Sequence, residues 1–507
     1  MKLDRSHNAI RNAGYGMINR TVTILFPFFV RTIFIKELGA EYLGLNSLFT
    51  SILTVLNLTE LGFSSAIVYS MYKPIAEDDS DTINALLNFY RHVYMVIGII
   101  ILAVGAVLIP FLPKLVHGSY PSDINLTVVY LVYLINTSIS YFLFAYLSSL
   151  ITAFQREDVI SKVNLIVSLF MYSLQIAVLI SVKNYYVYIL IMPLFTIINN
   201  IRTAIIAKKM FPQYRPIGTL KKEIKSDIKQ KVSGLMIGKI CNVSRNAFDS
   251  IFISMFLGLA ETAMYNNYYF IMNAIVSFMV VITTAVNAGA GNSVSMESVE
   301  KNYRDMNRMN FIYMWISGWF TACLLCLYQP FMQIWVGEKL MFPFSIVVLI
   351  CIYFYVLKMG DIRSIYVQAK GIWWENRFRA IAESIANLVL NYVLGKRFGV
   401  YGIIIATLIS LFAINFCYGS QIIFKYYFVK QRVSEYYKIN LFYAFATLSA
   451  CVLTFAFCRV IPNGNIGMFV LKMLICTVVP NVVFYLLYHR TRIYAEAVPW
   501  VLSKIRK

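Results

Sequence analysis

Long apolar runs, each about the length of a membrane-spanning helix, follow one another along almost the whole chain of 507 residues. A helix needs about 20 mostly apolar residues to cross the hydrocarbon core of a bilayer. The runs predict about fourteen spanning helices, so we expect an all-α polytopic membrane protein. The predicted spans are 14–36, 42–71, 88–112, 125–152, 163–182, 185–207, 233–258, 261–289, 309–328, 344–369, 379–396, 399–425, 439–459 and 466–489.

Two of the junctions between spans are very short. A tight turn near Lys183 and Asn184 is predicted between the fifth and sixth spans, and the segment 396–399 joins the eleventh to the twelfth. No polar loop is long enough to fold as a domain of its own, so the function is expected to lie within the bilayer.

Composition supports the membrane interpretation. Hydrophobic residues make up 59% of the chain and charged residues 14%, whereas soluble domains have roughly 45–50% and 25%. A soluble multidomain enzyme is therefore excluded. A membrane β-barrel is disfavoured as well, because its strands alternate apolar and polar residues.

The net charge of +21 comes largely from Lys and Arg residues in the loops. With the N-terminus placed in the cytoplasm, the inside segments hold 29 Lys and Arg residues and the outside loops hold seven. Positive charge accumulates on the cytoplasmic side of membrane proteins, so both termini are predicted to be cytoplasmic and no nucleic-acid partner is needed.

Short matches suggest an internal duplication. Residues 33–39 resemble 251–258, and 110–118 resemble 330–337, at offsets of about 218–220. The offsets predict two six-helix lobes in parallel orientation around a central cavity, followed by two C-terminal helices. The predicted domains are an N-lobe at 1–207, a basic amphipathic cytoplasmic linker at 208–232, a C-lobe at 233–425, and a final part at 426–507 with the last two spans and a basic tail.

In the linker, an apolar residue recurs every four positions, with lysines between. These residues are Leu220, Ile224, Ile228 and Val232. Two interpretations stay open: a helix that lies flat on the inner leaflet, and a purely mechanical connection between the lobes.

Charged side chains within the spans are the main functional candidates, because each costs at least a few kcal/mol unless it faces a cavity or a partner. The cations predicted to line the cavity and bind an anionic substrate are Arg20, Arg31, Lys239, Arg245, Lys358 and Arg363. The carboxylates predicted to couple transport to an ion are Glu60, Asp249 and Asp361. The alternative for any one of them is a fixed ion pair, such as Arg245 with Asp249, or a side chain that reaches the interface.

No catalytic constellation is present in the sequence. The four histidines are scattered and there is no GxxxxGK[ST] phosphate loop, so neither an enzyme nor a cofactor is predicted. All eight cysteines lie in apolar runs and are interpreted as small buried residues without a metal or disulfide role.

With these residues considered, the chain resembles the Wzx-type polysaccharide flippases of the MOP (multidrug, oligosaccharidyl-lipid and polysaccharide) exporter superfamily. The resemblance covers nearly the whole length and rests on loose motifs. These are Arg31-Thr-Ile with Leu38-Gly39 and Gly44, the segment 61–66, Asp249-Ser-Ile-Phe with Leu257-Gly258 and Tyr265-Asn266, Pro330-Phe331 with Trp335-Val336-Gly337, and the segment 398–406.

The resemblance implies a monomer with two lobes in a V, which moves an undecaprenyl-pyrophosphate-linked oligosaccharide across the bacterial plasma membrane by alternating access, without ATP. It implies membrane lipids and other polysaccharide-assembly proteins as partners. Two alternatives remain. One is a multidrug or other lipid exporter of the same superfamily, of which the multidrug exporter would take cations and favour an acidic cavity. The other is a membrane-embedded polysaccharide polymerase or glycosyltransferase, which would need a large outer loop.

Overall fold

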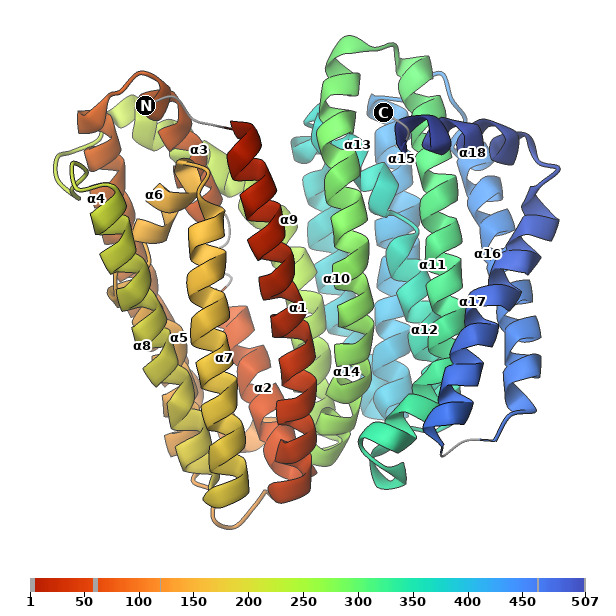
Figure 1. The fold of residues 1–507 in the computed structure, drawn as a ribbon, viewed down its shortest axis with the longest axis horizontal. Helices are drawn as coiled ribbons and strands as arrows, with labels where there is room; N and C mark the ends of the chain where they lie inside the picture. The colour runs from red at the N-terminus through yellow and green to blue at the C-terminus, as the bar shows by residue number, and fades with distance from the viewer. Residues whose placement is uncertain (1–4, 58–62, 119, 463–464, 506–507) are drawn as a thin grey trace. The chain divides into compact units, whose positions relative to one another are not determined.

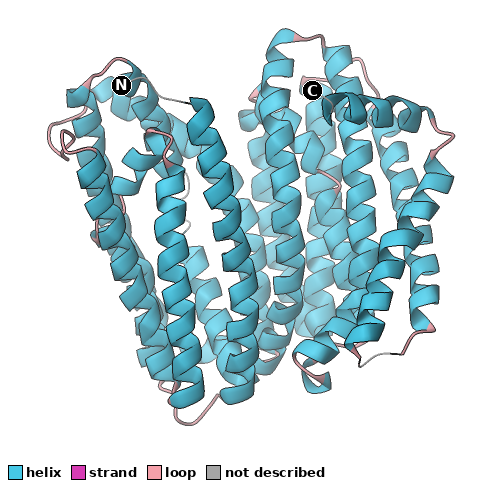
Figure 2. Ribbon diagram, in the orientation of Figure 1, coloured by secondary structure: helices cyan, strands magenta, loops and turns pink. Residues whose placement is uncertain are grey.

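The computed structural model describes residues 5–57, 63–118, 120–462 and 465–505, and every regular element within them is a helix (Figure 2). The all-α fold predicted from the sequence is confirmed. The chain forms two compact units, Met1–Ala263 and Met264–Lys507, and each is described by itself.

Unit 1 contains nine α-helices and one 3-10 helix among its described residues (Figure 1). They are α1 (Arg5–Glu37), α2 (Ala40–Leu56), α3 (Phe63–Ala76), α4 (Ser80–Leu108), the 3-10 helix η2 (Ile109–Leu115), α5 (Leu126–Phe142), α6 (Leu147–Ala153), α7 (Glu157–Ser181), α8 (Tyr185–Met210) and α9 (Lys222–Phe256).

Unit 2 begins within the first turns of α10. Its elements are α10 (Leu259–Met296), α11 (Val299–Trp335), the 3-10 helix η3 (Glu338–Leu340), α12 (Phe344–Lys358), α13 (Asp361–Lys370), α14 (Trp373–Ile409), the π-helix η4 (Ser410–Tyr418), α15 (Gly419–Tyr426), α16 (Val433–Arg459), α17 (Ile466–Tyr488) and α18 (Arg492–Ile505).

Within the described residues, ten helical stretches are long and apolar enough to cross a membrane, or up to eleven if the bent pair α5 and α6 forms one span. Large apolar side chains are exposed on the outer faces of these helices, as expected for contact with lipid. The chain is therefore a multi-pass membrane protein. The predicted count of fourteen is not confirmed.

Breaks in the helices account for much of this difference. Within the predicted span 42–71, α2 is described to Leu56 and α3 from Phe63, and residues 58–62 lie outside the described part of the chain. The predicted span 125–152 consists of α5 and α6, which are bent by 59°. The eleventh and twelfth predicted spans lie in one helical stretch of 53 residues.

That stretch nevertheless changes direction where the sequence predicts a junction. Gly399 has φ 57° and ψ −134°, which is not a helical conformation. A Cβ atom on Gly402 would overlap the backbone of Leu394. Glycine is thus required twice here, once for its backbone angles and once for close approach.

The turn predicted near Lys183 is confirmed, because α7 ends at Ser181 and α8 begins at Tyr185. Lys183 has a positive φ of 51°. The Asn184 side chain accepts a hydrogen bond from the backbone N–H of Val187 at 3.2 Å and caps α8.

The basic segment before the predicted seventh span is continuous with that span, since α9 runs from Lys222 to Phe256. Ile228 and Val232 are buried in the hydrophobic core of unit 1, together with Leu220, and Ile224 packs against that core. The apolar face of this segment is therefore covered by protein.

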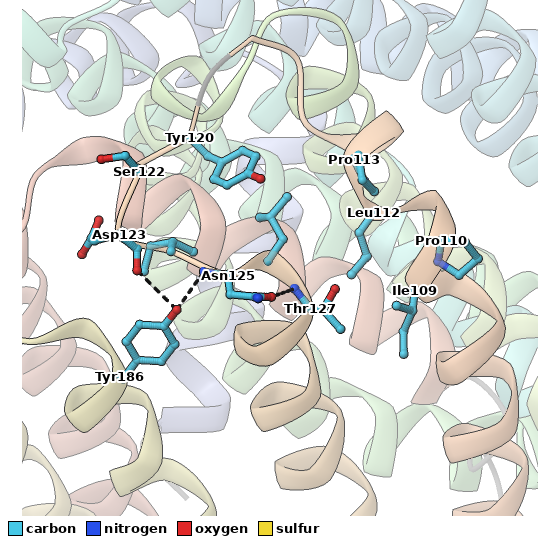
Figure 3. Close-up of a pocket in the computed structure, with 12 residues that line it drawn as sticks. Ile109, Pro110, Leu112, Pro113, Tyr120, Ser122, Asp123, Asn125, Thr127 and Tyr186 are labelled. Atoms are coloured by element: carbon cyan, nitrogen blue, oxygen red, sulfur yellow. Dashed lines mark hydrogen bonds between the residues drawn. The ribbon is translucent and has the colours of Figure 1, made fainter.

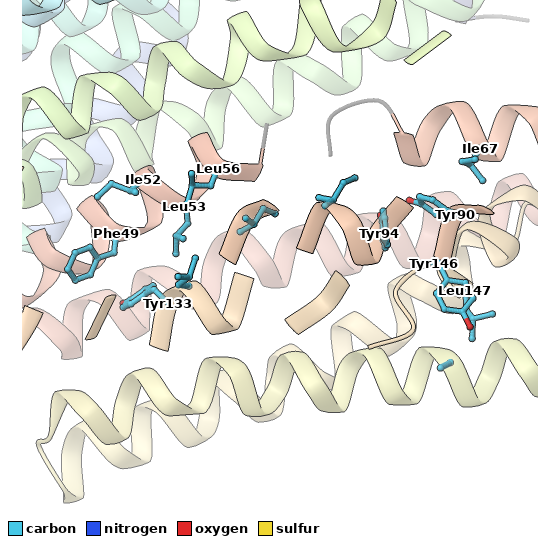
Figure 4. Close-up of a cluster of buried hydrophobic side chains, with 14 of the residues drawn as sticks. Phe49, Ile52, Leu53, Leu56, Ile67, Tyr90, Tyr94, Tyr133, Tyr146 and Leu147 are labelled. Carbon is cyan, nitrogen blue, oxygen red and sulfur yellow. The ribbon is translucent and has the colours of Figure 1, made fainter. Parts of the chain in front are cut away.

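The core of unit 1 gathers side chains from α2, α3, α4, α5 and α6 (Figure 4). Phe49 contacts Tyr130 and Tyr133 of α5 at ring-centroid distances of 5.6 and 5.8 Å. Within unit 1, α1 packs along α7, and Phe34 of α1 contacts Tyr188 of α8 at a ring-centroid distance of 4.9 Å. The charged helix α1 thus contacts two helices of its own unit.

Candidate functional site: charged clusters at helix breaks

A partly buried ion pair lies where α12 ends and α13 begins. Lys358 is 4% exposed, and its Nζ lies 2.9 Å from Oδ2 of Asp361. The Tyr313 hydroxyl on α11 donates a hydrogen bond of 2.6 Å to the same oxygen. Asp361 is also the first residue of α13, where a negative charge is favoured by the helix dipole.

Arg363 follows one half-turn later and is 2% exposed. Its Nη1 donates to the backbone oxygen of Asn415 at 3.0 Å, and its Nη2 donates to Oδ1 of Asn415 at 3.3 Å and to Ser364 Oγ at 3.2 Å. The guanidinium is therefore held mainly by one residue of the π-helix η4.

Asn415 lies in the π-helix η4 and accepts from Arg363 with both its backbone oxygen and its side-chain oxygen. A π-helical turn is wider than an α-helical turn, and such turns occur often at functional sites. The carbonyl oxygen of Asn415 accepts from Arg363 at 3.0 Å. This arrangement could not be predicted from the sequence, because Asn415 lies 52 residues beyond Arg363.

Asn415 also links Arg363 to a second buried pair. Glu383 on α14 is 2% exposed, and its Oε2 accepts from Asn415 Nδ2 at 2.9 Å and from Arg379 Nη1 at 2.6 Å. Arg379 Nε donates to Asn376 Oδ1 at 2.8 Å. Buried charges are tolerated when they are paired and hydrogen-bonded in this way.

Two glycines leave room for the Arg363 guanidinium. A Cβ on Gly419 would overlap Arg363 Nη1, and a Cβ on Gly360 would lie 3.1 Å from Nη2. The group is therefore enclosed by backbone on two sides.

Three of the residues predicted from the sequence thus lie together around the α12–α13 break of unit 2. They are Lys358, Asp361 and Arg363. In this conformation Lys358 and Arg363 bond to protein groups. Arg379 and Glu383 complete the cluster and were not predicted as site residues. Their i,i+4 spacing is a signal that could have identified the pair.

The remaining predicted residues belong to unit 1 or lie outside the described residues. Arg245 and Asp249 on α9 are buried, with 6% and 0% exposure. On α1, Arg31 is half-buried and interacts electrostatically with Tyr188 of α8, whereas Arg20 is exposed. Glu60 and the Lys239 side chain lie outside the described residues.

Three thiols form the one cluster in the described part of the chain whose geometry could hold a metal ion. Cys326 on α11, Cys458 on α16 and Cys476 on α17 are buried, and their sulfur atoms lie within 4.8 Å of one another. Thiolates favour soft ions such as Cu(I). The sequence predicted no metal role for them, and the surrounding side chains are apolar.

A polar pocket of about 610 Å³ lies in unit 1 between η2, the start of α5 and α8 (Figure 3). The Tyr186 hydroxyl accepts from the Asn125 backbone N–H at 2.7 Å and donates to the backbone oxygen of Asp123 at 3.4 Å. Tyr42 donates to Oδ1 of Asp123 at 2.6 Å. Such hydroxyls and aromatic faces suit a ligand rich in hydroxyl groups, but none of the predicted site residues lines this pocket.

Comparison with solved structures identifies similar folds. One match, at 15% identity and a TM-score of 0.67, covers 95% of this chain and 99% of the other, which is described as "Lipid II flippase MurJ, inward closed conformation". A second, at 12% identity and a TM-score of 0.59, covers 78% of this chain and 95% of an inward-facing multidrug resistance MATE family transporter of the MOP superfamily.

A third match is a MOP superfamily transporter from Pyrococcus furiosus, whose title reports a binding pocket of reverse polarity. It is 14% identical and has a TM-score of 0.53, and the match covers 82% of this chain and 96% of that transporter. At these identities the likeness shows the fold.

Among curated proteins no sequence matches. The family model described as "Polysaccharide biosynthesis protein" matches residues 9–288, which is more than half of the 507 residues. The Wzx-type resemblance inferred from the motifs agrees with this match, and the chain belongs to the polysaccharide biosynthesis protein family.

Proposed function

We propose that this protein moves an oligosaccharide, linked through pyrophosphate to a polyprenyl lipid of the undecaprenyl class, across the bacterial plasma membrane by alternating access. The family and the MOP-type fold support a transporter of a lipid-linked substrate. The proposal includes cytoplasmic termini, a monomer without a cofactor, and delivery of the sugar to other polysaccharide-assembly proteins.

The observation that carries the proposal is the charge on α1. Arg20 and Arg31 lie within a candidate span, Gly14–Glu37, that holds no carboxylate before its last residue. A pyrophosphate has two or more negative charges and cannot enter hydrocarbon alone. Arginine suits it because the planar guanidinium binds two phosphate oxygens at once.

The cations divide into two roles in this proposal. Arg20 is exposed in this conformation and attracts the headgroup first, and Arg31, which is half-buried with its Nη2 covered, follows. The buried cations Arg245, Lys358 and Arg363 add positive potential, and they are reached only when the helices around them move. Lys239 belongs to the same proposed set.

Ion coupling is assigned in the proposal to Asp361 and Asp249, with Glu60 as a third carboxylate. Asp361 is better placed than Asp249, because its side chain is 32% exposed while it is bonded to Lys358. Binding of a cation to Asp361 would weaken that ion pair and free the Lys358 ammonium for a phosphate.

The test is transport of a labelled lipid-linked oligosaccharide by the purified protein in proteoliposomes. Loss of one charge-assisted contact costs roughly 1.5–3 kcal/mol, so R31Q is expected to reduce transport at least about tenfold at low substrate concentration. R31K should retain part of the activity. Arg397 is an exposed cation in the turn before Gly399, so R397Q serves as the control.

Equal transport by wild type, R31Q and a folded R20Q/R31Q double variant would contradict the proposed role of α1. Transport that is absent in wild type for every pyrophosphate-linked sugar, but present for cationic drugs, would instead support the multidrug alternative.

A further inference from the structure

A second pocket, of about 580 Å³, lies in unit 2 and contains none of the residues assigned above to transport. It is lined by α11, α16 and the start of α18. Figure 1 shows α18 running across the bundle, and Tyr494 fixes it on α11 through ring contacts with Phe311 and Trp315 at 6.4 and 6.2 Å. The pocket is thus a built feature at one end of these helices.

The pocket carries an excess of positive charge. Arg304, Lys438 and Arg492 line it together with a single carboxylate, Glu496. That carboxylate is already neutralised, because Arg492 Nε lies 2.8 Å from Oε1 and Arg308 Nη2 lies 3.2 Å from Oε2.

Two cations remain available to a ligand. Arg304 is exposed, and no ion pair is recorded for it within the residues described. Lys438 lies 3.0 Å from Glu435, but both side chains are more than half exposed, at 71% and 53%. Exposed pairs of this kind are weak and yield readily to a phosphate.

The same pocket offers a polar acceptor and an apolar wall. Asn307 Oδ1 is buried and has no hydrogen-bond partner in the part of the chain that the structure describes. Ile439, Phe442 and Ile493 form the apolar part of the lining. A ligand that fits should therefore combine an anionic group, a hydroxyl donor and an apolar portion.

An apolar stripe on α16 leads away from the pocket. Leu441, Phe445, Leu448 and Val452 are exposed by 71%, 59%, 62% and 59%. Their spacing of four, three and four residues places them on one face of the helix. Lys438 lies three residues before Leu441 and so stands at the end of the stripe.

We propose that this pocket binds the headgroup of an anionic membrane phospholipid with a hydroxylated headgroup, such as phosphatidylglycerol, with one acyl chain along the stripe on α16. The phosphate contacts Arg304 and Lys438, and a headgroup hydroxyl donates to Asn307 Oδ1. Basic pockets between transmembrane helices are suited to such headgroups. The occupant is a resident lipid, and the proposal does not depend on which substrate is transported.

The test is lipid binding to the full-length purified protein, measured by native mass spectrometry with increasing phosphatidylglycerol, phosphatidylethanolamine or glycerol 3-phosphate. Each basic residue near a membrane surface changes anionic-lipid binding about fivefold. The R304Q/K438Q double variant is therefore expected to bind phosphatidylglycerol about 25-fold more weakly. K430Q is the matched control, since Lys430 is exposed and paired with Glu300 at 3.4 Å but does not line the pocket.

A pocket-filling variant, I439W, keeps every charge and should also remove the tight phosphatidylglycerol-binding event. Retained binding in I439W would point to diffuse surface charge and overturn the proposal. Equal binding of phosphatidylglycerol and phosphatidylethanolamine, or equal loss in K430Q and the double variant, would overturn it too. Binding of glycerol 3-phosphate as tight as that of the lipid would show a site for soluble phosphates instead.

Discussion

Replacing Gly419 by alanine should separate the Arg363 guanidinium from the π-helix. A Cβ on Gly419 would overlap Arg363 Nη1 and would lie 2.9 Å from both Arg363 Cζ and Arg379 Cδ. Ordinary contacts begin near 3.4 Å, so the guanidinium must move and give up its bonds to Asn415.

The size of the effect follows from those bonds. A hydrogen bond made by a charged group contributes about 1.5–3 kcal/mol, and the two bonds from Arg363 to Asn415 are 3.0 and 3.3 Å long. Alanine gains at most about 1 kcal/mol over glycine through helix propensity. We expect G419A to destabilise the protein by about 2–4 kcal/mol, because the loss of even one of these bonds and the overpacking exceed that gain.

The assay is thermal unfolding of the purified protein in one detergent, with transport measured in parallel. G467A is the control, because a Cβ on Gly467 would meet only Asn465 Oδ1 at 3.6 Å. A double-mutant cycle with R363M isolates the contact: once the guanidinium is gone, G419A should cost much less. A melting temperature of G419A at or above those of wild type and G467A would refute this account of the cluster.

Two further pairs of variants test local interactions. Asp79 caps α4 by accepting from the Thr82 backbone N–H at 3.0 Å, and hydrogen bonds from Thr82 lower its pKa; D79A should lower the melting temperature while D79N largely preserves it. Because the pKa of Asp79 is lowered, the stability that its charge contributes is present above about pH 4 and is lost as the pH falls through the folded-state pKa, so the difference between wild type and D79A should shrink in acid to that between D79N and D79A. The Tyr313 hydroxyl donates to a carboxylate, Asp361, at 2.6 Å, whereas the Tyr328 hydroxyl donates to a neutral backbone oxygen at 3.0 Å. Y313F should therefore cost about 1.5–3 kcal/mol and Y328F about 0.5–1.5 kcal/mol, and the reverse order in thermal unfolding would contradict the importance of the ionised acceptor.

The sequence predicts those parts of the fold that depend on local signals. Apolar runs predict the helices, and the turns at Lys183 and Gly399 lie where polar residues and glycine interrupt the runs. Hydropathy could not predict the 59° bend between α5 and α6, because the residues that join them, Leu143 to Tyr146, remain apolar and aromatic.

For the candidate site, the sequence identifies the charges but few of their partners. The pair formed by Lys358 and Asp361 is three residues apart and follows from helix geometry. The bond from Asn415 to Glu383 joins residues 32 positions apart. Such a contact depends on how α14 packs beside η4, and hydropathy carries no information about that packing.

The charged cluster of unit 2 lies at irregular backbone. Lys358 pairs with Asp361 at the α12–α13 break, and Arg363 donates to the carbonyl and the amide oxygen of Asn415 in the π-helix η4. A buried guanidinium needs several acceptors, so a rearrangement of η4 that withdrew Asn415 would cost several kcal/mol. Movement of these helices would therefore have to exchange those acceptors for others, which the oxygens of a phosphate can supply.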